Sequence, residues 1–196
     1  MIYLVAFLGN HGKQYALNRH NVAWQFADAL PSLSSLSWQK KFKGQYTSRA
    51  IPDAPPGQNL VHFIKPETFM NLSGESIVGV CSFFKIKPEE VLVVHDEIEL
   101  PLGIVSLKWS GGLGGHNGLR STKAVLNTAD FWRLRFGVGR PDHPDVAGHV
   151  LSDFSTDERI TLSRIWPPAG DLLSCIIEKG PEPFLKEWAK KKVVEV

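Results

Sequence analysis

His20 is the side chain whose type and position best suit proton transfer. A helix is expected to begin at or just after it, because Val22, Phe26 and Leu30 recur every four residues. A neutral imidazole accepts a proton from water near pH 7. The helix dipole would keep the ring uncharged, and a carboxylate such as Asp96 would fix its tautomer and stabilise the proton-accepting form. Because a single histidine is more often a helix cap or a core residue, the role of general base is a hypothesis.

Three asparagines could hold a carbonyl group without adding charge: Asn10, Asn71 and Asn117. An amide stays neutral at every working pH and offers two donors and one acceptor. A donor directed at a developing oxyanion can lower the barrier by about 3 kcal/mol. Asparagine also serves in turns and helix caps, and for Asn71, which precedes an apolar run, that alternative is equally good.

Aromatic and sulfur-containing side chains lie near these positions. Tyr15, in a polar loop, could stack on a base or a sugar, whereas Phe69 and Met70 are expected in the core or the wall of a pocket. Cys81 lies in the apolar run SIVGVCSFF, which favours buried packing over a nucleophile. Cys175 is far along the chain, so the two cysteines predict neither a disulfide scaffold nor a metal site, and a cytosolic, reducing setting fits best.

The glycine-rich segment 111–118, GGLGGHNG, lies between an expected strand and an expected helix. It is a weak match to a dinucleotide-binding turn, since the acidic residue about twenty positions further on is missing. It also lacks the Lys-Ser/Thr ending of a phosphate-binding loop. We interpret it as a close approach of backbone to a ligand or as a flexible loop, and a nucleotide-dependent enzyme is kept as an alternative.

Several other classes of protein have no support in the sequence. The opening MIYLVAFLGN is a short apolar run without a basic leader, so we expect a buried strand rather than a signal peptide or a membrane span. No other segment is apolar enough to cross a bilayer. No histidine pair has metal-binding spacing, and no GxSxG motif indicates a serine nucleophile.

Charge is unevenly distributed although the net charge is only +2. Residues 1–50 and 105–141 each hold six Lys or Arg against one acid, while the segments 51–104 and 142–196 are acidic. If the two basic segments meet in space, they form a positive patch that would attract a polyanion. The alternative is that these charged side chains are scattered over the surface and solvated. Without other observations, the charge distribution favours this alternative.

Strands alternate with helices, which predicts one α/β domain over residues 1–196 with a twisted, mixed, mostly parallel sheet between helices. In such sheets ligands bind beyond the carboxyl ends of the strands, where Asn10 and Asp96 are expected. We expect a loop at 141–149 with two prolines. The expected strands are 2–8, 45–50, 59–65, 90–94, 103–109 and 131–138; the expected helices begin near His20, Asn71 and Leu119, and two more, 156–178 and 182–192, close the fold.

Five motifs occur together in the order and spacing of the bacterial-type peptidyl-tRNA hydrolases, and over residues 2–155 the chain resembles this family. They are LGNHGKQYALNRHN, PETFMNLSG, VVHDEIELPLG, GGHNGLRS and FWRLRFGVGRP. The resemblance implies a monomeric, cytoplasmic α/β enzyme that hydrolyses the ester between a peptide and the terminal ribose of tRNA, without a metal or cofactor. A chain of this kind that has lost activity and only binds RNA is a second alternative, although His20 and Asp96 are both present.

The resemblance also implies roles for individual residues. His20 would accept the proton, Asp96 would stabilise its basic form, and Asn10 would discriminate N-blocked from free aminoacyl groups. Tyr15, Phe69, Asn71 and Asn117 would contact the peptidyl-tRNA end, with Met70 in the wall. Candidates for phosphate contacts are Lys108, Arg120, Lys123, Arg135 and Arg140. Three positions depart from the family pattern: His11, usually Pro, and Ser110 and Leu113, usually Gly and His, in the glycine-rich loop.

Overall fold

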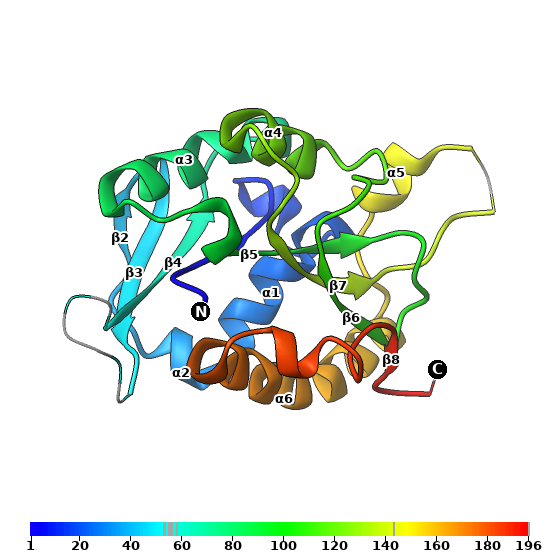
Figure 1. Ribbon diagram of the computed structural model, residues 1–196. Coiled ribbons are helices and arrows are strands. Elements are labelled where there is room, and N and C mark those ends of the chain that lie inside the picture. The colour runs from blue at the N-terminus through cyan, green and yellow to red at the C-terminus, as the bar shows by residue number, and fades with distance from the viewer. Residues whose placement is uncertain (53, 55–56, 58, 143, 196) are drawn as a thin grey trace.

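The computed structural model describes residues 1–195 except 53, 55, 56, 58 and 143, and it contains one eight-stranded sheet (Figure 1). The strand order is β2-β3-β4-β1-β5-β7-β6-β8. The strands are β1 (Leu4–Phe7), β2 (Gln39–Lys41), β3 (Gly44–Ala50), β4 (Leu60–Pro66), β5 (Val91–Glu97), β6 (Ile104–Trp109), β7 (Trp132–Gly137) and β8 (Lys191–Lys192). The α-helices are α1 (Val22–Ala29), α2 (Pro31–Ser34), α3 (Ser73–Phe84), α4 (Asn117–Leu126), α5 (Val146–Val150) and α6 (Thr156–Lys179).

Parallel strands form the centre of the sheet and antiparallel strands its edges. β1 pairs in parallel with β4 and β5, and β5 pairs in parallel with β7. The pairs β2–β3, β3–β4, β6–β7 and β6–β8 are antiparallel. The predicted α/β class with a mixed sheet and a parallel core is therefore confirmed.

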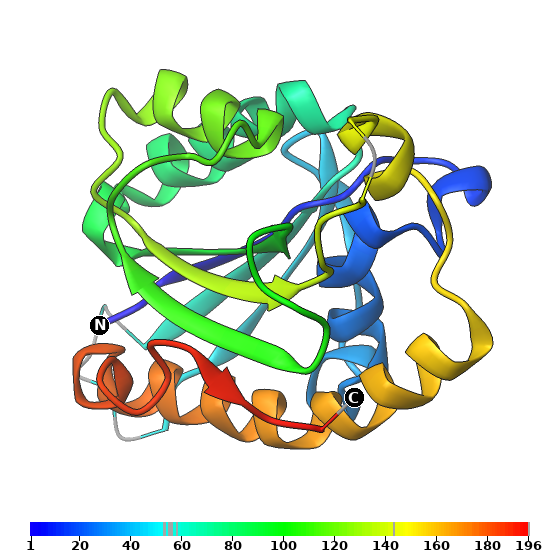
Figure 2. The ribbon, with the colours of Figure 1, turned by 90° about the vertical axis from the view of Figure 1, so that its right-hand side faces the viewer.

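Helices cover both faces of the sheet, and two apolar cores result (Figures 1 and 2). β1 is buried on both sides, as its continuous apolar run predicts. Leu4 and Ala6 face the core beneath α3 and α4, whereas Val5 and Phe7 face the core shared with α1, α2 and α6. The helix predicted at 156–178 is α6, which begins with the capping box of Ser155 and Glu158.

The prediction of a second closing helix at 182–192 is wrong. A single 3₁₀ turn occurs at Glu182–Phe184, and β8 then pairs antiparallel with β6. Pro181 and Pro183 disfavour a continuous helix in this segment. The open edge of β6 instead supplies backbone hydrogen bonds to it; for example, the Leu107 N–H donates to the Trp188 carbonyl over 2.7 Å.

Two smaller elements also differ from expectation. β2 was not predicted, because its sequence Gln-Lys-Lys has no apolar alternation and it is held by pairing with β3. Part of the expected loop 141–149 is the short helix α5, capped by the Asp145 side chain, which accepts the Gly148 N–H. Position 143 of this loop and part of the turn predicted after β3 lie outside the described residues.

Close packing of α3 on α4 sets the distance between the two helices above the sheet. The Gly74 N–H donates to the Ser121 hydroxyl over 2.9 Å. A Cβ at Gly74 would lie 2.4 Å from the Ser121 carbonyl oxygen, so only glycine permits this approach. Among the helices that the structure describes, none is both long enough and apolar enough to span a membrane.

Candidate active site

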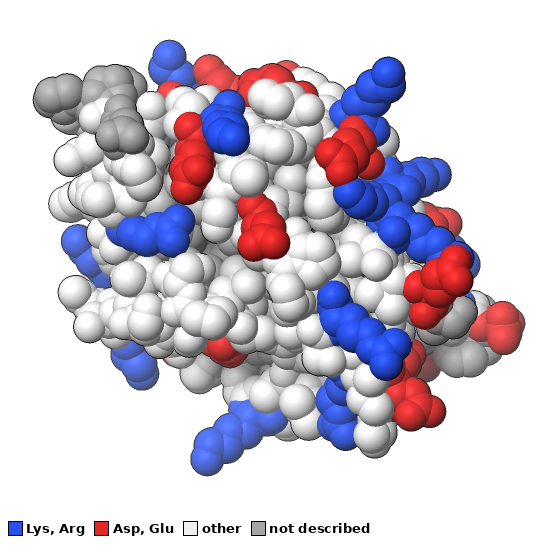
Figure 3. Space-filling model, turned by 90° about the horizontal axis from the view of Figure 1, so that it is seen from below, with Lys and Arg blue, Asp and Glu red and all other residues white. Residues whose placement is uncertain are grey.

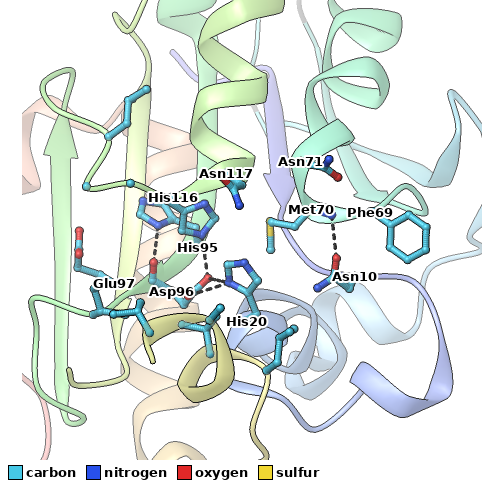
Figure 4. A pocket seen from close by; sticks show the side chains of 18 residues that line it. Asn10, His20, Phe69, Met70, Asn71, His95, Asp96, Glu97, His116 and Asn117 are labelled. Carbon is cyan, nitrogen blue, oxygen red and sulfur yellow. Dashed lines mark hydrogen bonds and ion pairs between the residues drawn. The ribbon is translucent and has the colours of Figure 1, made fainter. Parts of the chain in front are cut away.

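A cavity of about 460 Å³ opens where the carboxyl ends of β1 and β5 meet the N-terminal ends of α3 and α4 (Figure 4). Helix α5 and the glycine-rich loop form the rest of its wall. Seven of the residues selected from the sequence line this cavity: Asn10, His20, Phe69, Met70, Asn71, Asp96 and Asn117. Tyr15 is not among the lining residues.

His20 and Asp96 form the central pair of the cavity. The His20 Nδ1 atom lies 2.9 Å from both carboxylate oxygens of Asp96, whose side chain is only 2% exposed. A carboxylate only accepts, so Nδ1 carries the proton. The second ring nitrogen, Nε2, is then left with a free lone pair, which is the form that a general base requires.

Electrostatics favour proton uptake by His20. Burial lowers the pKa of His20, but the charge of Asp96 and its hydrogen bond outweigh burial and raise that pKa above its ordinary value of 6.5. For Asp96, burial raises the pKa, and the two histidines His20 and His116 outweigh it and hold the pKa well below its usual range. Asp96 is therefore a carboxylate near neutral pH, as an orienting acid must be.

His116 is a third member of this cluster, and the sequence reasoning missed it. Its Nδ1 atom accepts the backbone N–H groups of Gly118 (3.1 Å) and Leu119 (3.4 Å), which caps α4. Nε2 therefore carries the ring proton and donates to Asp96 Oδ1 over 2.9 Å. The position of His116 directly before a helix was the available signal, but that helix was expected to begin only at Leu119.

The protonation of His116 bears on metal binding. His20, Asp96 and His116 each place one possible ligand atom within 4.8 Å of the others. A metal ligand must present a lone pair, yet His116 Nδ1 is occupied by the cap and its Nε2 holds a proton. The donor set therefore suits a hydrogen-bonded cluster better than a metal centre.

His95 supports Asp96 from within the sheet. Its Nδ1–H donates to the Asp96 backbone carbonyl over 2.7 Å, and the ring is buried. Burial, the largest cause, holds the pKa of His95 well below 6.5, so the ring is neutral. Its Nε2 has no hydrogen-bond partner among the described residues.

Asn10 is held by its backbone and its Oδ1, and its amide nitrogen has no hydrogen-bond partner among the described residues. Its Oδ1 accepts the Met70 N–H over 2.8 Å (Figure 4). Its backbone exchanges two 2.9 Å hydrogen bonds with the Asn21 side chain. Asn71 and Asn117 are exposed, and their side chains have no hydrogen-bond partner among the described residues. All three asparagines can therefore offer donors to a ligand.

The side chains at the mouth of the cavity differ in exposure. Phe69 is 59% exposed, so its ring is available for stacking, whereas Met70 is buried. Cys81 lies on the buried face of α3, and burial together with the Glu90 charge raises the pKa of its thiol to about 12. That pKa agrees with the packing role expected for Cys81.

The five candidate cations fall into two groups. Arg135 donates to Glu97 (3.2 Å) and to the Ser106 hydroxyl (2.8 Å), and Arg140 pairs with Glu99. Lys108, Arg120 and Lys123 have no ion-pair partner among the described residues. Arg133, which was not selected, is buried and donates to the Gly111 and Gly112 carbonyls over 2.6 and 2.7 Å, so it supports the glycine-rich loop.

The connection from α5 to α6 is attached to the segment before His20. The Arg19 guanidinium donates to both oxygens of Glu158 (2.7 Å each) and to the Ser152 hydroxyl (2.7 Å). Asn18 Nδ2 donates to Asp153 over 2.6 Å, and the two segments form a β-bridge there. One set of contacts thus positions both His20 and the base of the α5 wall.

Comparison with known proteins identifies the family. A family model described as peptidyl-tRNA hydrolase matches residues 4–195. The chain is 41% identical to a peptidyl-tRNA hydrolase of Treponema pallidum over 200 residues, which is 100% of this chain and 98% of that protein. It is 46% identical to one of Neisseria meningitidis serogroup C over 161 residues, 81% of each chain.

Solved structures agree. Peptidyl-tRNA hydrolase from Acinetobacter baumannii matches with a TM-score of 0.86 at 30% identity, over 98% of this chain and 97% of that one. The chain belongs to the peptidyl-tRNA hydrolase family. As a member it is a hydrolase, and the reaction that it catalyses is hydrolysis of peptidyl-tRNA.

The three positions expected to depart from the family pattern occur together with the hydrogen bonds of Asn10 and Asp96 described above. His11 is exposed, with Nδ1 3.7 Å from Glu67, and the neighbouring Asn10 keeps its contacts with Asn21 and Met70. Ser110 adopts a positive φ of 50° and donates to Asp130 over 2.7 Å. Leu113 adds an apolar side chain to the cavity wall.

Proposed function

We propose that His20 Nε2 is the general base that activates the hydrolytic water, with Asp96 holding the imidazole in the required tautomer. The observation that carries the proposal is the pair of 2.9 Å contacts from His20 Nδ1 to Asp96, which leaves Nε2 unprotonated beside an open cavity. As Nε2 takes a proton from water, the oxygen bonds to the ester carbonyl carbon. The bond from that carbon to the ribose oxygen then breaks, and the imidazolium returns its proton to the ribose oxygen.

The asparagines bind the acyl group in this proposal. The exposed, unpartnered amides of Asn71 and Asn117 are donors for the oxyanion that forms when water attacks. Asn10 Nδ2 is oriented by the bond from Met70 to Asn10 Oδ1, which suits it to discriminate an N-blocked aminoacyl group from a free one. Phe69 and Tyr15 contact the terminal nucleotide by stacking, with Phe69 at the mouth of the cavity and Tyr15 outside its lining.

Phosphates of the acceptor arm are bound by basic side chains outside the cavity in the same proposal, chiefly Lys108, Arg120 and Lys123, which have no acidic partner among the described residues. Contacts of this kind are independent of sequence, which suits an enzyme that accepts many tRNAs. Arg135 and Arg140 contribute charge while remaining paired with acids. The enzyme acts as a monomer in the cytoplasm, without a metal or cofactor.

Cleavage of an N-acetyl-aminoacyl-tRNA, in the presence and absence of a chelator, tests the proposal. The wild type should cleave it and spare the free aminoacyl-tRNA, and chelator should have no effect. His20→Ala should lower kcat by about 10²–10⁴-fold because proton transfer is lost, with little change in tRNA affinity. The exposed His11→Ala is the matched control and should keep full activity. Wild-type turnover in His20→Ala would refute the assignment of the base.

A further inference from the structure

Positive charge accumulates at the end of the sheet formed by β7, β6 and β8, on side chains that do not line the cavity. Lys108 of β6 is opposite Arg133 of β7, and Ser106 is opposite Arg135 in the same ladder. Glu97 is the acid that contacts this group, and it contacts only Arg135 among the three cations. Lys108 has no acidic partner among the described residues, so the cluster carries unbalanced positive charge.

The C-terminal segment brings a further cation to this edge. Val105 is opposite Lys191 in the β6–β8 ladder, and Leu107 donates its N–H to Trp188 over 2.7 Å. The Ser106 hydroxyl donates to the Ala189 carbonyl and accepts from Arg135, so one side chain joins the segment to the cluster. Lys190 lies between these two attachments and is exposed.

Lys190 differs from the two lysines that follow it in its pairing. Lys191 pairs with Glu187, and Lys192 lies 3.2 Å from Glu195. Lys190 has no ion pair with any described residue. Burial, and then the charges of Arg135, Arg133 and Lys190, lower the pKa of Lys108 below its ordinary value, with Glu97 opposing them. The attachments of Ala189 and Lys191 to β6 place Lys190 beside the strand that carries Lys108.

Like charges held together by backbone pairing are stabilised when an anion with several acceptor oxygens lies between them. We propose that Lys190 joins Lys108 and Arg135 in binding one phosphate group of the tRNA, which makes the C-terminal segment part of the RNA-binding surface. On the right-hand side of Figure 3, where β8 and the C-terminus lie in Figure 1, lysines and arginines alternate with acidic side chains. The inference rests on the proposed use of Lys108 and Arg135 for phosphate binding.

The salt dependence of binding tests the inference directly. Binding of deacylated tRNA to wild type and to Lys190→Gln is measured over a range of salt concentrations. Loss of one phosphate contact should weaken binding and reduce the slope of log Kd against log salt by about 1. Lys190→Arg should restore affinity. Lys186→Gln, on the same segment but not among the charges that act on Lys108, is the matched control and should behave like wild type.

Kinetics separate phosphate binding from a structural role. Lys190→Gln should raise KM for N-acetyl-aminoacyl-tRNA with kcat unchanged, because Lys190 is outside the cavity. It should leave hydrolysis of an N-acetyl-aminoacyl ester of adenosine unaltered, since that ester lacks the acceptor-arm phosphates. Equal loss on both substrates, or a wild-type salt slope, would overturn the inference.

A double-mutant cycle with Lys108→Gln tests whether the two lysines share one phosphate. Shared binding predicts that the two losses in tRNA affinity are not additive, whereas full additivity would contradict a common phosphate. The test also separates this inference from the proposed function. If the wild type does not cleave the ester but Lys190→Gln still reduces the slope of log Kd against log salt, the proposed hydrolysis is refuted and the phosphate contact stands. If the wild type cleaves the ester and Lys190→Gln leaves that slope unchanged, only this inference is refuted.

Discussion

His116 connects Asp96 to the start of α4, because its Nε2–H donates to Asp96 Oδ1 over 2.9 Å while its Nδ1 caps the helix. One imidazole thus ties the orienting carboxylate to the helix that presents Asn117. Nδ1 of His116 stabilises the helix, and Nε2 contacts Asp96 at the site. Different substitutions at this position can therefore separate the effect on stability from the effect on activity.

His116→Ala should destabilise the protein by about 0.5–2 kcal/mol through loss of the cap, and it should also lower kcat. His116→Asn should recover much of the stability, since asparagine is a good N-cap, but not the contact with Asp96. Urea unfolding and steady-state kinetics on both variants measure this. Wild-type kcat in His116→Asn would show that the contact with Asp96 is not used in turnover.

Asp96→Asn should change the pH dependence as well as the rate. Activity requires unprotonated His20, so wild-type kcat/KM should fall as pH drops through the His20 pKa, which lies above 6.5. Without the Asp96 charge only the lowering effect of burial is left, so the acid limb should move to lower pH. The plateau should fall because the tautomer is no longer fixed. An acid limb that stays in place would mean that another group controls it.

Glu158→Gln should weaken the attachment between α6 and the segment before His20. We expect a loss of about 1.5–3 kcal/mol at pH 7, from the hydrogen bonds between charged groups. Burial raises the pKa of Glu158, but bonds from Ser155 and Arg19 outweigh it and lower the pKa below 4.5. The contribution is therefore present above pH 4.5 and is lost as pH falls through the lower, folded-state value.

Urea midpoints above and below pH 4.5 measure this difference, which should shrink on the acid side. Glu99→Gln is the matched control, because its ion pair with Arg140 is more than half exposed and should be worth about 0–1 kcal/mol. Equal losses in Glu158→Gln and Glu99→Gln would contradict a special role for the Arg19 attachment.

Gly74→Ala should separate α3 from α4, since its Cβ would lie 2.4 Å from the Ser121 carbonyl oxygen. We expect destabilisation of about 1–3 kcal/mol and lower kcat, because Asn117 lies at the start of α4. Gly79→Ala in the same helix is the control. Its Cβ would lie 3.5 Å from the Phe42 ring, an ordinary contact, so it should be neutral or stabilising by up to about 1 kcal/mol. Thermal unfolding of both variants decides the matter.

The amino-acid sequence by itself determined the central strands and the long helices, the family resemblance, and the residues that could do chemistry. Apolar periodicity is set by near neighbours along the chain, so β1, β5 and α6 were expected close to their observed bounds. The motif spacing likewise selected His20, Asp96 and Asn10, all of which line the cavity.

Only the tertiary structure decided which atoms meet and which proton each ring carries. His20 and Asp96 are 76 residues apart, and they meet because β1 and β5 are parallel neighbours in the sheet. The tautomer of His116 depends on where α4 begins. Strand β8 forms because its backbone pairs with the open edge of β6, and the helix propensity of residues 182–192 gives no information about that pairing. Hydrogen bonds between distant segments follow from sheet order, which local sequence does not encode.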